Sequence, residues 1–105
     1  MENQEKIVIA AASFYKQSYF FNDEFLGLPR AVKDEIREML ILKAQHICGV
    51  VSLGFYSTGE VFLEATGAED DFGYDEIGAK YAINQLIREE EEFFQSLSSW
   101  YMNLA

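Results

Sequence analysis

The clearest pattern in the chain is an alternation of apolar and polar residues between residues 48 and 66. Apolar side chains recur at every second position in two successive segments: Val51, Leu53 and Phe55, then Val61, Leu63 and Ala65. A repeat of two residues is the period of a β-strand that is buried on one face. Gly59 lies between the segments and tolerates the positive φ that tight turns require. The pattern predicts an antiparallel β-hairpin whose odd-numbered side chains are sheltered by helices.

The segment from Gln4 to Phe21 carries conflicting signals. Ile7, Val8 and Ile9 are β-branched and favour a strand, whereas the three alanines that follow favour a helix. The segment is longer than an ordinary strand and lacks strict alternation, so we predict a helix.

Two further segments have helical spacing. Pro29 suits the first position of a helix, and we predict a helix from there to about His46, with Asp34 and Glu35 near the favourable end of its dipole. Asp75 is a good N-cap for a last helix that runs to about Tyr101. The prediction is an α+β domain over 1–105, with two N-terminal helices, one antiparallel hairpin and one long C-terminal helix.

An isolated two-stranded hairpin is only marginally stable in water, and its edges stay open. A homodimer that joins two hairpins into one sheet would solve both problems; alternatively, the last helix would form the dimer surface. Aromatic residues are enriched at interfaces. The candidate interface residues lie on the mixed face of the hairpin and on the last helix: Tyr56, Phe62, Phe94, Trp100 and Tyr101.

Charge narrows the range of partners. The net charge is −10; residues 1–52 carry seven acids and six bases, whereas residues 53–105 carry eleven acids and two bases. This balance argues against binding to nucleic acid or to an anionic membrane, both of which need clustered Lys and Arg. Cys48 is the single cysteine, which excludes an intrachain disulfide. No segment has the ~20 apolar residues of a membrane span, and we expect a cytoplasmic protein.

Clustered carboxylates provide the best candidate for metal chemistry. Asp70 and Asp71 lie in an acidic segment over 69–76 that also holds Asp75, and hard cations such as Ca²⁺ or Mg²⁺ prefer such ligands. Glu90 lies on the apolar stripe of the last helix, where a carboxylate needs a partner. The alternative is a solvated turn followed by acids at a helix N-terminus.

Short motifs connect the chain to known sequences. Tyr19-Phe20-Phe21-Asn22, Leu28-Pro29 and Tyr74-Asp75-Glu76-Ile77-Gly78 resemble a family of small bacterial proteins of unknown function. That resemblance implies a bacterial origin and no activity.

Because no catalytic or cofactor motif is present, we expect no cofactor and favour a non-enzymatic, homodimeric protein-interaction domain. A cation-dependent binding or hydrolytic domain that uses the 69–76 segment is one alternative. An acidic decoy that mimics DNA is another.

Overall fold

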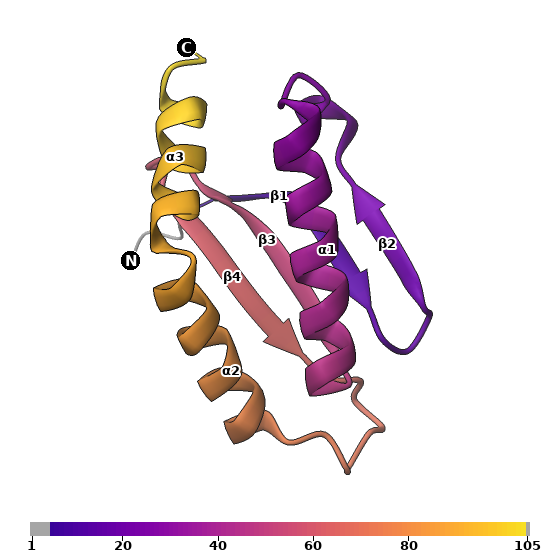
Figure 1. Ribbon diagram of the computed structural model, residues 1–105. Helices are drawn as coiled ribbons and strands as arrows, with labels where there is room; N and C mark the ends of the chain where they lie inside the picture. Colours follow the sequence, from indigo (N-terminus) through magenta and orange to yellow (C-terminus); the bar gives the residue numbers. More distant parts are fainter. Residues whose placement is uncertain (1–4, 105) are drawn as a thin grey trace.

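The computed structural model describes residues 5–104 of the chain. Four antiparallel strands form one sheet in the order β2-β1-β3-β4. Three α-helices cover one face of this sheet, α1 over its centre and α2 with α3 along β4 (Figure 1). The strands are β1 (Lys6–Ser13), β2 (Ser18–Phe21), β3 (Val50–Tyr56) and β4 (Val61–Thr66), and the helices are α1 (Arg30–Ile47), α2 (Glu76–Glu89) and α3 (Glu91–Met102), with a short 3₁₀ helix at Asp23–Phe25.

The hairpin predicted over 48–66 is confirmed as β3 and β4. Leu53 pairs with Leu63 and Val51 with Ala65. The side chains of Val51, Leu53 and Phe55 are fully buried beneath the helices. Strict alternation predicted this hairpin because every inward residue is apolar.

The predicted helix over 4–21 is wrong, because residues 6–21 form strands β1 and β2. The pairing of β1 with β3 shifts between Val8 and Ala10, so Ile9 is the extra residue of a β-bulge. Ile9 and Ala10 are consequently both fully buried, and this breaks the alternation that would have revealed a strand. Tertiary contacts override the helix propensity of alanine here, since Ala10 and Ala12 are buried in the core beneath the helices.

The helix predicted from Pro29 to His46 is confirmed as α1, which begins at Arg30 immediately after the proline. It ends at Ile47, and its C-cap Cys48 adopts a left-handed conformation with φ of 56°. Because α1 begins at Arg30, Asp34 and Glu35 lie in its second turn, beyond the first turn where the helix dipole favours acids.

For the last helix, the predicted start at Asp75 is confirmed, whereas the prediction of one continuous helix is wrong. The Asp75 side chain accepts a hydrogen bond from the Gly78 N–H at 2.9 Å, as an N-cap does. The predicted single helix is interrupted at Glu90, whose φ of −109° and ψ of 27° are not helical. The order of elements is therefore β-β-α-β-β-α-α instead of α-α-β-β-α, within the predicted α+β class.

The sheet changes the basis of the dimer prediction. Strand β1 pairs with β3 along its length, so one chain already supplies the strands that a second copy was expected to provide. Strands β2 and β4 form the two edges. A homodimer stays a prediction. The argument that first motivated it, that one chain supplies only two strands, no longer applies because the sheet has four.

The core lies between the sheet and the helices. Its largest fully buried side chains come from both layers and include Ile9, Ile36, Leu40, Leu53 and Phe55. Burial of one such side chain contributes about 1.5–3 kcal/mol. Tyr101 of α3 stacks on Phe55 with ring centroids 4.1 Å apart, which ties the last helix to the sheet. No helix within residues 5–104 is long and apolar enough to cross a membrane.

Candidate functional site

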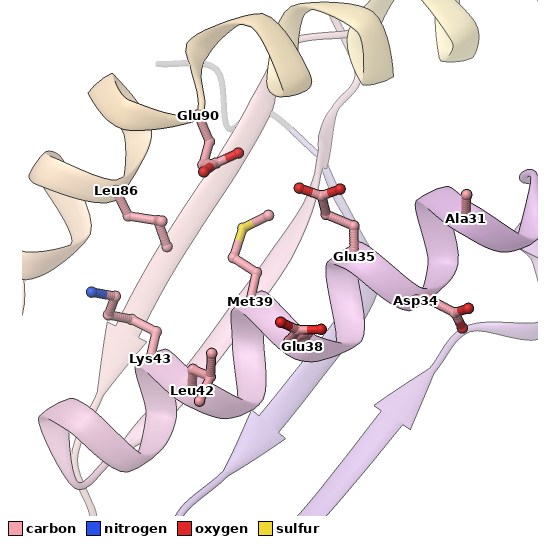
Figure 2. Close-up of a pocket in the computed structure, with 9 residues that line it drawn as sticks. All are labelled: Ala31, Asp34, Glu35, Glu38, Met39, Leu42, Lys43, Leu86 and Glu90. Carbon is pink, nitrogen blue, oxygen red and sulfur yellow. The ribbon is translucent and has the colours of Figure 1, made fainter.

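A groove lies on the helical side of the molecule, between α1 and the junction of α2 with α3 (Figure 2). Its cavity volume is about 620 Å³. Met39 of α1 and Leu86 of α2 provide its apolar floor, and Leu42 adds an apolar side chain that is 63% exposed. The residues that complete the lining are Ala31, Asp34, Glu35, Glu38, Lys43 and Glu90.

The break between α2 and α3 determines where Glu90 lies. Its backbone N–H still donates to the Leu86 carbonyl at 2.9 Å, and its own carbonyl accepts from the Phe94 N–H at 3.0 Å. Glu90 therefore ends one helix and begins the next. Figure 2 shows its carboxylate in the groove, with Glu35 and Met39 pointing toward it from α1.

The groove is strongly acidic, with four carboxylates and one ammonium group, that of Lys43. Within residues 5–104 the only salt bridge joins Lys6 and Glu64, outside the groove. The four groove carboxylates of the described chain are therefore without an ionic partner. Asp34 and Glu38 are four residues apart on α1, a spacing at which like charges destabilise a helix.

The predicted acidic segment is arranged differently. Asp71 accepts one hydrogen bond from the Tyr15 hydroxyl at 2.7 Å and another from the Gly73 N–H at 3.0 Å. Asp75 caps α2, whereas Asp70 is exposed. Across the described part of the chain, no group of three or more His, Cys, Asp or Glu residues is placed to hold a metal ion. Glu90 lies in the groove and not with the three aspartates, so the four predicted ligands do not form one site.

Tyr15 connects this loop to the turn between β1 and β2. Its hydroxyl also accepts a hydrogen bond from the Ala68 N–H at 3.0 Å. That N–H lowers the pKa of Tyr15, but desolvation and the hydrogen bond to Asp71 together raise it above its ordinary value of 10.0. Two carboxylates of the loop, those of Asp71 and Asp75, thus have partners within the chain.

The candidate interface residues on the hairpin pack against their own sheet. Phe62 is only 5% exposed because its ring covers Gly54, where the Cβ of any other residue would lie 2.6 Å from the ring. Tyr56 contacts Phe62 with centroids 5.2 Å apart. The Lys6 ammonium lies over both rings and pairs with Glu64. These residues form a cluster on the face of the sheet opposite the helices.

The candidate interface residues on the last helix lie in the core or at its edge. Phe94 is buried, and Tyr101 stacks on Phe55. Trp100 is half-buried, with its ring centroid 6.4 Å from that of Phe25. An interface role for these residues stays a prediction.

The sequence pattern singles out Glu90 but not the acids of α1. Asp34 and Glu35 match the expectation for a helix dipole, and Glu38 stands out in no pattern of its own. Two signals could have revealed them. One is the like-charged pair Asp34 and Glu38 at a spacing of four, and the other is Leu42, an apolar residue four positions after Glu38 and so on the same side of the helix.

The fold and the groove define an α+β domain whose antiparallel sheet carries helices on one face and an acidic cleft between those helices. The chain belongs to the family of unknown function DUF6145, whose model matches residues 6–105. The expected resemblance to a family of unknown function is confirmed, and its bacterial origin stays a prediction. No curated protein and no solved structure matches the chain.

Proposed function

We propose that this protein is an interaction domain that binds a basic, amphipathic helical segment of a partner protein in the groove between α1 and the α2–α3 junction. The observation that supports this proposal is the combination of an apolar floor with carboxylates that have no ionic partner among the described residues. An amphipathic helix that lays its apolar face in such a groove is a recurring mode of peptide recognition.

The apolar part of the groove supports binding through burial. Met39 is partly buried, and Leu42 is largely exposed beside it. An exposed apolar side chain next to a cleft gains free energy when a partner covers it, at about 25 cal/mol per Å² of apolar surface removed from water.

The charges define the chemistry of the partner. Glu35 on α1 and Glu90 at the helix junction face the same cleft, and like charges in one site repel each other. Lys or Arg side chains of a partner would remove this repulsion and would pair with Asp34 and Glu38 on the outer side of α1. The same argument disfavours an acidic segment.

A designed peptide provides the test. A fluorescein-labelled helical peptide of leucine and lysine, with leucines at heptad spacing, is titrated with the protein, and anisotropy is measured. We expect binding that weakens as salt rises, and at least about tenfold loss in the double variant Glu35→Lys/Glu90→Lys.

A matched control separates groove charge from total charge. The variant Glu60→Lys/Glu69→Lys makes the same change in net charge at two exposed positions outside the groove. We expect this control variant to bind the leucine–lysine peptide nearly as well as the wild type does. A leucine–glutamate peptide of the same pattern should bind neither the wild type nor the control variant. Equal losses in the two double variants, or no binding by the wild type, would contradict the proposal.

The homodimer is a separate proposal. Multi-angle light scattering at micromolar concentration would support it by a mass of twice the 12.0 kDa chain, and a mass of one chain would contradict it. We do not propose the DNA decoy, because Glu64 lies on the open face of the sheet and Glu90 on the helical side.

A further inference from the structure

A second, apolar cleft lies at one end of the acidic groove. Leu28 lines it from the segment before α1, Val32 from the first turn of α1, and Phe93, Leu97 and Trp100 from α3. Its volume is about 210 Å³. No charged side chain lines it, in contrast to the groove beside it.

Helix α1 lines both cavities, and the opposite wall continues from the α2–α3 junction in the groove into α3 in the cleft. Val32 in the cleft precedes Glu35 in the groove by three residues, which is about 4.5 Å along α1. On the other side, Phe93 in the cleft follows Glu90 in the groove by three residues. Met39 lies seven residues, or about 10 Å, beyond Val32. Apolar cleft, acidic pair and apolar floor therefore follow one another at steps of about one helical turn.

We infer that the cleft receives one large apolar side chain of the same partner helix, an inference that rests on the proposed function. The partner would carry this anchor, a Lys or Arg three or four residues away, and a second apolar residue at seven. These side chains lie on one face of a helix. A buried apolar anchor in a pocket, with charged contacts around it, is the usual distribution of binding energy in protein interfaces.

The size and lining of the cleft favour an aliphatic or phenyl side chain. The cleft contains no charged group that would need a new partner when the bound side chain displaces water. Removal of a leucine anchor would forfeit most of the apolar contact that the cleft offers, which corresponds to about tenfold in affinity or more.

Trp100 is the only tryptophan of the chain and lines the cleft, so tryptophan fluorescence reports on the surroundings of this one residue. The probe is an unlabelled, tryptophan-free leucine–lysine peptide. It is compared with a variant in which the anchor leucine is replaced by alanine and with a set of variants in which each of the other leucines is replaced singly. We expect the parent to shift Trp100 emission to the blue and the anchor→Ala peptide to bind about tenfold more weakly without that shift.

A substitution that fills the cleft tests whether the anchor side chain of the peptide binds there. Ser96 is exposed and lines the cleft, so Ser96→Phe would occupy the cleft without disturbing the core; Ser99→Phe, on the same helix outside the cleft, is the control. We expect Ser96→Phe to weaken the parent peptide about tenfold and to leave the anchor→Ala peptide unchanged, a non-additive result.

The outcomes separate this inference from the proposed function. Charge-dependent binding that no single leucine replacement weakens by more than about twofold, or equal losses in Ser96→Phe and Ser99→Phe, would overturn the anchor and leave the groove standing. Absence of all binding to the wild type would overturn both.

Discussion

Two acidic regions of this molecule use the same carboxylate chemistry in opposite ways. In the loop before α2, Asp71 accepts two hydrogen bonds and Asp75 caps the helix. In the groove, Glu35, Glu38 and Glu90 have no ionic partner among residues 5–104. The loop acids stabilise their own fold, whereas the groove acids have no ionic partner in it and stay available to the partner that we propose. The following variants test this difference, from the largest expected effect to the smallest.

Asp75→Ala removes the N-cap of α2 and leaves the Gly78 N–H without its acceptor. We expect a loss of about 1 kcal/mol in the free energy of unfolding, within the range of about 0.5–2 that such caps contribute. Urea denaturation followed by circular dichroism measures it. Asp75→Asn is the control, because asparagine also caps; a loss of equal size in Asp75→Asn would show that the cap is not the cause.

Tyr15→Phe removes the hydroxyl that joins Asp71 and the Ala68 N–H. We expect a small loss in the free energy of unfolding, since one exposed hydroxyl with two hydrogen bonds is replaced and the ring stays. The pKa of Tyr15 is raised in the folded state, so this contact is present below pH 10 and is lost as the pH rises through the folded pKa. A wild type and a Tyr15→Phe variant of identical stability at pH 7 would contradict the contact.

Glu38→Lys should have the opposite sign. It converts the like-charged spacing with Asp34 into an attractive one on α1, so we expect a gain of about 0.2–0.5 kcal/mol. Differential scanning calorimetry at low salt measures it, and Glu69→Lys, at an exposed acid of the loop before α2, is the matched charge control. A loss of stability in Glu38→Lys would mean that this acid already has a partner within the fold, and the contrast between the two regions would fail.

The smallest effect is expected from cations at the loop. Asp71 and Asp75 already use their oxygens within the chain, so millimolar Ca²⁺ or Mg²⁺ should change the melting temperature by less than about 1 °C. A rise of several degrees that Asp71→Ala abolishes would restore the acidic segment as a cation site.

Much of the fold follows from local patterns, and the exceptions have identifiable causes. The inward-facing residues of β3 and β4 alternate without interruption, so the face that packs against the helices can be read from the sequence, whereas the burial of Phe62 on the opposite face cannot. Strand β1 contains a bulge at Ile9, and a bulge removes the two-residue period on which recognition depends. The break at Glu90 involves no Gly or Pro, and nothing in the local sequence marks it.

The candidate site was only partly predictable for a different reason. Glu90 attracted attention because it is a carboxylate on an apolar stripe. The acids of α1 matter only because α2 and α3 lie beside that helix with a cleft between them, and the spacing of two packed helices is not encoded in the pattern of either one.

Gly54 limits the aromatic surface that is exposed on the open face of the sheet. Any side chain at this position would collide with the Ile7 carbonyl and would lie 2.6 Å from the ring of Phe62. The ring would have to swing outward and would present on the order of 200 Å² of aromatic surface to water. A missing methyl group thus lets the Phe62 ring stay buried, which makes Gly54 the residue that limits the aromatic surface exposed on this face.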